Sequence, residues 1–227
     1  MSYIKLIRFF ISACIVLLIG YIFYHLYFSP ENDLPITEIK SDKNTYLNIV
    51  NFTSTEYKNN VTESVLSAES AVIKSRKFSI FKINQLNELV LKKAVLTINM
   101  NNRKIMDIDP FEKLLLILDE NISSNKNKFF NIEIDDLQIN YYQEDILILK
   151  IIAKKAAVKF KGNNTKLKNL ILEQPSTNRR IASKSAIWNA DTKLFIIDGA
   201  YFLETPKDRK RGKKININLD FDILPQN

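Results

Sequence analysis

Histidine and cysteine, the side chains most used in nucleophilic catalysis and zinc binding, are almost absent from this 227-residue chain. His25 is the only histidine and Cys14 the only cysteine, and both lie in one apolar stretch near the N-terminus. A Ser-His-Asp or Cys-His hydrolase needs an imidazole beside its nucleophile, and zinc sites are built mainly from Cys and His. The rest of the chain therefore offers only carboxylate, Lys or Tyr chemistry. We expect a protein that is not an enzyme and has no metal site and no cofactor.

Two pairs of adjacent carboxylates remain as candidates for acid–base chemistry. Asp135 and Asp136 lie within an alternating segment, and Glu144 and Asp145 follow shortly after it. Adjacent residues of a strand point to opposite faces, so neither pair would bring two carboxylates onto one substrate. Solvated strand faces or turns explain both pairs better.

Basic residues exceed acidic ones, and they are densest between Lys207 and Lys214. The formal net charge of +8 favours an anionic partner such as nucleic acid, lipid headgroups or a phosphorylated glycolipid. The basic run could meet phosphates on a glycolipid or on a membrane surface, but a solvated hairpin turn ending at Gly212 is the preferred interpretation. No groove-reading helix or aromatic platform motif accompanies the charge, so nucleic acid is not an expected partner.

The segment Phe9–Phe28 predicts a membrane-spanning helix. Its twenty residues carry no charge. At about 1.5 Å per residue they span about 30 Å, the thickness of the hydrocarbon core of a bilayer. Lys5 and Arg8 precede the segment, whereas Glu31 and Asp33 follow it. Positive flanks stay in the cytoplasm, so we expect a single-pass protein with a cytoplasmic N-terminus and the remaining residues on the far side.

Two other interpretations of this segment are weaker. A cleavable signal peptide has a shorter apolar region and a small-x-small exit, which this segment lacks. Ile11–Cys14 resembles a lipobox, but too few apolar residues precede it and the apolar run continues past Cys14. We therefore assign residues 1–28 to an N-terminal transmembrane anchor, 29–44 to a spacer and 45–227 to one folded domain.

The domain has the pattern of an all-β protein. Short alternating apolar runs are separated by clusters of Asn, Asp, Lys and Ser, as expected for an antiparallel sheet with one face covered. Asp109–Glu120 departs from the pattern: an Asp before Pro110 can start a short helix, and a strand with buried leucines fits equally well. The predicted strands include Lys92–Met100, Phe130–Ile139, Leu147–Phe160, Leu167–Leu172, Lys193–Phe202 and, with the most regular alternation, Lys214–Ile223.

A weak internal repeat links several of these strands. Each copy has a small residue, two polar positions, then Ala and an apolar residue, and a second apolar strand follows. A repeated hairpin cannot bury its apolar face alone, so we expect the copies to stack. Small residues at fixed places would let two sheets approach closely or leave room for a guest. The copies are Ser67–Val72, Ile152–Val158 and Ala182–Trp188.

Together with the N-terminal helix and the spacer, these repeats resemble the LptA/LptC-like family of the lipopolysaccharide export (Lpt) machinery, and its membrane-anchored, LptC-type members in particular. The chain differs from that family in its few glycines and in a long stretch, residues 89–131, whose role the sequence does not give. The similar segments, within residues 45–223, are the Ala68/Ala71 hairpin, the Ala153/Ala156 hairpin, Arg180–Trp188, and Phe195–Tyr201 with the C-terminal strand.

The resemblance implies an antiparallel β-jelly-roll, or β-taco, with an apolar interior, in the periplasm and anchored in the inner membrane. Proteins of this family pass lipopolysaccharide from an inner-membrane ABC transporter towards the outer membrane and join their neighbours edge to edge. The expected partners are lipopolysaccharide or a similar glycolipid, the ABC transporter complex, and an LptA-like bridge protein bound by strand addition. The strand Lys214–Ile223 is a candidate for that addition, and an ordinary edge or internal strand is the alternative.

The apolar faces of the predicted strands would line the lipid-binding groove. Each buried methylene of an acyl chain contributes about 0.8 kcal/mol, so such a groove holds lipid without covalent chemistry. The alternative is a cell-envelope scaffold whose β domain binds only proteins and needs no cavity. The expected groove residues are Phe81, Ile83, Leu96, Ile98, Ile132, Ile134, Val158, Phe160, Leu170, Leu172, Ala186, Trp188, Phe195, Ile197, Ile217, Leu219 and Phe221.

Overall fold

The computed structural model describes residues 45–58, 60–78, 81–101, 103–122, 129–159 and 162–224. The expected anchor and spacer lie outside these ranges. By its contacts the chain divides into Met1–Lys40 and Ser41–Asn227, and the second unit contains all the described residues. No helix within the described ranges is long and apolar enough to cross a membrane.

Strands account for most of the described residues, and the expectation of an all-β domain is confirmed. In chain order the elements are β1 (Thr45–Lys58), β2 (Val61–Phe78), β3 (Phe81–Lys92), β4 (Val95–Asn99), the 3₁₀ turn η1 (Ile105–Asp107), α2 (Pro110–Ile122), β5 (Phe129–Gln143), β6 (Ile146–Lys159), β7 (Asn164–Gln174), the 3₁₀ turn η2 (Pro175–Thr177), β8 (Arg179–Asn189), β9 (Leu194–Glu204), β10 (Arg209–Ile217) and β11 (Ile223–Leu224).

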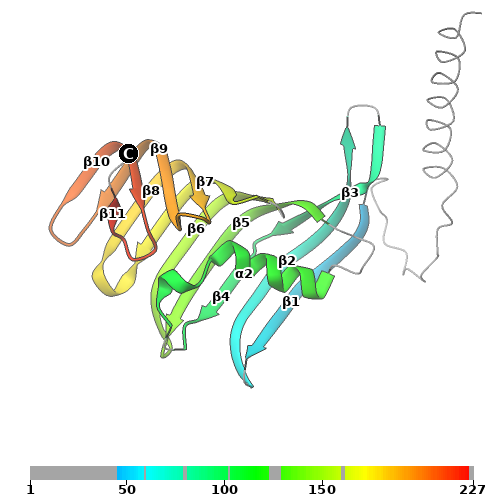
Figure 1. Cartoon of the computed structure of the whole chain (residues 1–227), viewed down its shortest axis with the longest axis horizontal. Helices are drawn as coiled ribbons and strands as arrows, with labels where there is room; N and C mark the ends of the chain where they lie inside the picture. The colour runs from blue at the N-terminus through cyan, green and yellow to red at the C-terminus, as the bar shows by residue number, and fades with distance from the viewer. Residues whose placement is uncertain are drawn as a thin grey trace, which may run out of the picture. The chain divides into compact units, whose positions relative to one another are not determined.

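These strands form one curled sheet in the order β1-β2-β3-β5-β6-β7-β8-β9-β10-β11, and β4 pairs with β2 and β5 (Figure 1). Most neighbours are antiparallel, but β5 runs parallel to both β3 and β4. The expectation of a purely antiparallel sheet is therefore wrong at this point. Parallel neighbours need a long connection that returns the chain to the same end of the sheet, and η1 and α2 supply it between β4 and β5.

Helix α2 is the part of the 89–131 stretch for which a helix and a strand fitted equally well, and the helix is correct. Asp109 caps it: one carboxylate oxygen accepts hydrogen bonds from the backbone N–H groups of Phe111 (2.8 Å) and Glu112 (3.0 Å). Pro110 occupies the first helical position, where no N–H is needed. The apolar side of α2, with Phe111 and Leu114, is buried against the concave face of the sheet (Figure 1).

The buried positions of the strands shift by one residue along a line across the sheet, which we call the crease. In a regular strand every second side chain points to the core. At the crease two outward residues intervene, and Lys93, Asp136 and Asn169 there have left-handed backbone conformations (φ 48°, 59° and 51°). The buried pairs that flank the crease include Ala68 and Ala71 on β2, Ile134 and Leu137 on β5, Ala153 and Ala156 on β6, Leu167 and Leu170 on β7, and Ser183 and Ala186 on β8.

The crease explains the repeat seen in the sequence. The two polar positions of each copy are the outward residues, and the small residues flank them. The strand register sets large residues against small ones, since Ala153 lies opposite Leu170 and Ala156 opposite Leu167. Small side chains on alternate strands therefore leave space for the leucines and isoleucines of their neighbours where the sheet bends.

The C-terminal strand differs from its prediction. The expected strand Lys214–Ile223 breaks at Asn218, after β10, and β11 folds back against it. The side-chain oxygen of Asn218 accepts hydrogen bonds from the backbone N–H groups of Asp220 (3.0 Å) and Asp222 (2.8 Å), which fixes the reversal. Gly212, expected to end a turn, instead lies within β10, where the ring of Tyr201 occupies the space that a Cβ atom would need.

Candidate functional site

The interior of the curled sheet is the candidate site, because it contains the residues expected to line a groove. Phe81, Ile83 and Phe160 lie outside the residues whose side chains the structure describes. All the others are between 0 and 6% exposed and belong to one hydrophobic cluster. They are Leu96, Ile98, Ile132, Ile134, Val158, Leu170, Leu172, Ala186, Trp188, Phe195, Ile197, Ile217, Leu219 and Phe221.

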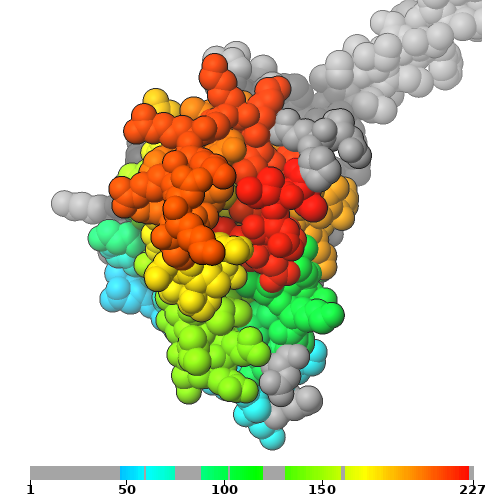
Figure 2. Space-filling view, turned by 90° about the vertical axis from the view of Figure 1, so that its left-hand side faces the viewer, coloured from blue at the N-terminus to red at the C-terminus, as the bar shows by residue number. Residues whose placement is uncertain are grey.

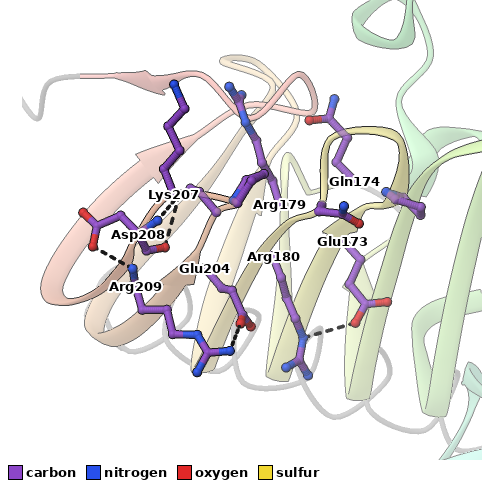
Figure 3. Close-up of a pocket in the computed structure, with 12 residues that line it drawn as sticks. Glu173, Gln174, Arg179, Arg180, Glu204, Lys207, Asp208 and Arg209 are labelled. Atoms are coloured by element: carbon purple, nitrogen blue, oxygen red, sulfur yellow. Dashed lines mark hydrogen bonds and ion pairs between the residues drawn. The ribbon is translucent and has the colours of Figure 1, made fainter.

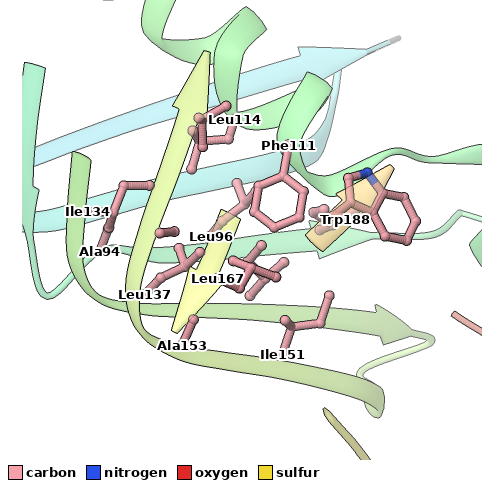
Figure 4. Close-up of a cluster of buried hydrophobic side chains, with 14 of the residues drawn as sticks. Ala94, Leu96, Phe111, Leu114, Ile134, Leu137, Ile151, Ala153, Leu167 and Trp188 are labelled. Atoms are coloured by element: carbon pink, nitrogen blue, oxygen red, sulfur yellow. The ribbon is translucent and has the colours of Figure 1, made fainter. Parts of the chain in front are cut away.

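Helix α2 lies against these side chains and closes the interior. Phe111 and Leu114 of the helix meet the sheet over its central strands (Figure 4). The ring centroid of Trp188 lies 6.2 Å from that of Phe111 and 4.7 Å from that of Phe195. The side chains expected to face a guest therefore face α2 and one another.

Two polar groups join the start of α2 to the sheet. The indole N–H of Trp188 donates a 2.9 Å hydrogen bond to the carboxylate oxygen of Asp109 that does not cap the helix. The hydroxyl of Tyr141 donates to the backbone carbonyl of Ile108 at 3.2 Å. Burial, and then the nearby charge of Asp109, raises the pKa of Tyr141 well above its ordinary value, so this hydroxyl remains a donor.

An ion-pair cluster that we call the latch attaches the same helix to β1 and β2. The Lys113 ammonium contacts Glu56 at 2.7 Å and Glu63 at 2.6 Å, and Arg103 pairs with the second oxygen of Glu63. The hydroxyl of Ser64 donates to Glu56 at 2.7 Å. The Lys113 and Glu63 side chains are only 10% and 4% exposed.

The charges of the latch depend on one another. Burial opposes ionisation of Glu63, but the hydrogen bond and charge of Lys113 and the charge of Arg103 outweigh it and lower the pKa of this carboxyl. A buried ion pair holds its geometry only while both partners are charged. The latch is therefore the part of the α2 contact that pH or a competing charge can weaken.

Sequence reasoning missed the latch. Only the Asp-Pro start of α2 pointed to any of this arrangement. Lys113 lies in the first turns of the helix, and its partners Glu56 and Glu63 are 57 and 50 residues away on strands whose faces the sequence did not separate. The contact depends on the crossover between β4 and β5, for which no local pattern exists.

The carboxylate pairs behave as turn and surface residues. Glu144 and Asp145 form the exposed turn between β5 and β6. Asp135 and Asp136 pair with lysines of β6 at 3.3 and 2.7 Å. The expectation that these two point to opposite faces is wrong, because both stand at the crease, where the alternation is interrupted. No group of three His, Cys, Asp or Glu side chains able to hold a metal occurs within the described ranges.

A surface pocket of about 900 Å³ lies between the β7–β8 and β9–β10 turns (Figure 3). Arg180 pairs with Glu173 at 3.1 Å and Arg209 with Glu204 at 2.7 Å, so two of its cations are already neutralised. The predicted basic run begins here but continues into β10 and is not confined to a turn.

A second pocket, of about 860 Å³, opens beside Glu63 and Arg103 of the latch. A third, of about 590 Å³, includes Phe221 in its wall.

Within the described chain the sheet has free edges at β1 on one side and at β10 and β11 on the other. β1 pairs only with β2, and β10 beyond its contact with β11 pairs only with β9. Figure 2 views the C-terminal end, where β10 in orange and β11 in red lie at the surface. Val50 and Tyr57 of β1 are 61% and 67% exposed. Such edges can receive a strand from another chain.

Neither a scan against protein-family models nor a search of the curated proteins finds a match for this chain.

Proposed function

We propose that the chain is a membrane-anchored, non-enzymatic lipid carrier of the LptC type. In this proposal Phe9–Phe28 spans the inner membrane with a cytoplasmic N-terminus, and the β domain is a periplasmic taco. It receives lipopolysaccharide or a similar glycolipid from an inner-membrane ABC transporter and passes it towards the outer membrane. An LptA-like neighbour adds a strand at a free edge, for which β10 and β1 are the candidates.

The observation that carries the proposal is the place of α2 in the sheet. An amphipathic helix covers an apolar interior that runs across the central strands, and its attachment includes the latch. An acyl chain that took the place of α2 would meet the same apolar side chains, at about 0.8 kcal/mol per buried methylene. Opening the latch would expose the interior without unpairing any strand.

A second candidate function is a cell-envelope scaffold that binds only proteins. One observation favours it: the expected groove residues are nearly inaccessible and pack against α2 and one another. In this case α2 is a permanent part of the core, and the free edges are the functional surfaces.

Photocrosslinking in cells distinguishes the two functions. A photoreactive amino acid is placed at Ile134, Val158, Phe195 or Leu219, which are buried, and at Lys92, which is exposed on β3 and serves as the control. A carrier gives lipid adducts at the buried positions and none at the control position.

A variant that weakens the attachment of α2 makes the same experiment more specific. If acyl chains replace the helix, Lys113→Met should increase the yield of lipid adducts at Ile134. If no buried position gives a lipid adduct, either with or without Lys113→Met, the lipid-carrier proposal is refuted and the scaffold function remains. Protein adducts at positions on β1 or β10 would then identify the partner edge.

A further inference from the structure

The excess positive charge of the chain is concentrated on three neighbouring strands. β6, β7 and β8 contain nine basic residues and one acidic residue, Glu173. Their net charge of +8 equals the formal net charge of the whole chain. The formal charges of all other residues of the chain therefore cancel. The three strands are adjacent in the sheet (Figure 1).

All of these basic side chains except Arg179 occupy the outer face of the strands; Arg179 lies on the side of buried Ile181, at the end of β8. Buried residues alternate with the outward ones, as Thr165 and Leu167 do on either side of Lys166. Only Lys154, Lys155 and Arg180 have an acidic partner among the described residues. We call the unpaired cations of the outer face the lysine face: Lys150, Lys159, Lys166, Lys168 and Lys184.

The crease shows how unusual this arrangement is within the fold. Elsewhere along it a lysine of one strand meets an acid of a neighbouring strand, as in Lys93–Glu69 and Lys214–Asp198. Between β6 and β7 the register sets Lys155 directly opposite Lys168. Lys155 also pairs with Asp135 of β5 at 3.3 Å, whereas Lys168 has no acidic partner among the described residues. Like charges in directly opposed positions destabilise a sheet, so these strands carry a cost that an external anion would remove.

The chemistry of the face favours a lipid surface over nucleic acid. Sheets that bind single-stranded nucleic acid stack bases on exposed aromatic rings. Trp188 is the only aromatic residue on β6–β8, and it is 1% exposed. Nearly all the cations are lysines, whose compact charge needs no fixed partner geometry and suits mobile phosphate headgroups.

We infer that the lysine face docks the β domain onto a membrane surface that contains anionic phospholipids. The inference rests on the proposed function only in that the expected anchor, Phe9–Phe28, would hold the domain beside a bilayer. The 29–44 segment, fully extended at about 3.4 Å per residue, reaches about 54 Å, which allows any face of the domain to meet that bilayer. Docking would fix the orientation of the domain, which an anchor with a long spacer leaves free.

The test uses the full chain with Cys14→Ser and Ile187→Cys, labelled with an environment-sensitive fluorophore. Ile187 is 38% exposed and lies opposite Lys166 on the lysine face. The protein is incorporated into vesicles of phosphatidylcholine alone or of phosphatidylcholine with phosphatidylglycerol, each containing a headgroup quencher. We expect quenching several-fold stronger in the anionic vesicles and its loss at high salt.

Charge reversal identifies the residues responsible. Lys166→Glu, Lys168→Glu and Lys184→Glu together should abolish the anionic-lipid quenching. The matched control reverses Lys58, Lys74 and Lys92, which are exposed on β1–β3, and should retain it. Unchanged emission of Trp188 verifies that each variant is folded.

Equal quenching in neutral and anionic vesicles, or equal loss in both triple variants, would overturn the inference. So would a label that responds to double-stranded DNA or polyglutamate but not to anionic vesicles. Flotation with pure phosphatidylcholine vesicles reports separately on the anchor. A chain that floats without anionic quenching refutes the lysine face alone, and a chain quenched only by anionic vesicles that does not float with neutral ones refutes the anchor alone.

Discussion

Replacing Lys113 by Met tests whether the latch holds α2 on the sheet. The substitution keeps the length of the side chain and removes the charge that neutralises Glu56 and Glu63. Breaking a buried ion pair by removing one partner costs about 3–5 kcal/mol. Since Arg103 remains beside Glu63, we expect the lower end, about 3 kcal/mol at neutral pH.

The same variant has a predicted pH dependence. The pKa of Glu63 is lowered in the folded chain, so its ionised form contributes stability above the ordinary value of 4.5 and loses it as pH falls through the lowered pKa. Without Lys113, burial of Glu63 is less opposed and its pKa rises. Protonation then removes the unpaired charge, so the difference in unfolding free energy between wild type and Lys113→Met should shrink below pH 4.5.

Urea unfolding of the full chain in detergent, followed by the emission of its single tryptophan, measures both effects. Trp188 is suited to this because it contacts α2 directly. The double variant Lys113→Met with Glu63→Gln should recover most of the loss, since Glu63, the more buried of the two carboxylates, no longer carries an unpaired charge. A loss below about 1 kcal/mol, the range of exposed ion pairs, would refute the latch, as would a loss that Glu63→Gln does not change.

Three other substitutions test the remaining contacts in the same unfolding assay. Asp109→Ala should lower the free energy of unfolding by about 2–4 kcal/mol and shift the emission of Trp188 to the red, because it removes a helix cap and a buried acceptor together. A loss below about 0.5 kcal/mol would contradict both roles. Ala156→Leu should cost about 1–3 kcal/mol by overpacking the crease, whereas the partly exposed neighbour Ala157→Leu should change stability by about 0.5 kcal/mol or less. Equal effects at the two positions would contradict the crease. Asn218→Ala should cost about 1 kcal/mol through the lost turn hydrogen bonds, and no change would show that the reversal forms without them.

The sequence predicted the elements of the domain better than their arrangement. The alternation around Leu96 and Ile98, and around Ile132 and Ile134, gave both strands and the buried face of each. Such patterns are local, because neighbouring side chains of a strand point to opposite faces. The same reasoning failed at Asn218, where a side-chain hydrogen bond ends a strand that the alternation would continue.

The repeat shows where local reasoning becomes ambiguous. The spacing of Ala153 and Ala156 was visible in the sequence, but it fitted close-packed sheets and a guest pocket equally well. Only the strand register, which sets Leu170 and Leu167 opposite them, shows that neighbouring side chains fill this space. Register is decided by pairing between strands and has no counterpart within one strand.

Composition by itself excluded histidine and cysteine side chains from residues 29–227, and hydrophobic alternation predicted the all-β character of the domain and the inward positions of most strands. Tertiary structure alone decided that β5 runs parallel to β3 and β4, that α2 closes the interior, and that Lys113 meets Glu63. It also gathered the net charge of the chain onto β6–β8. These features depend on residues that are distant in the chain, and folding brings them together through crossovers and strand order that local hydrophobic periodicity does not encode.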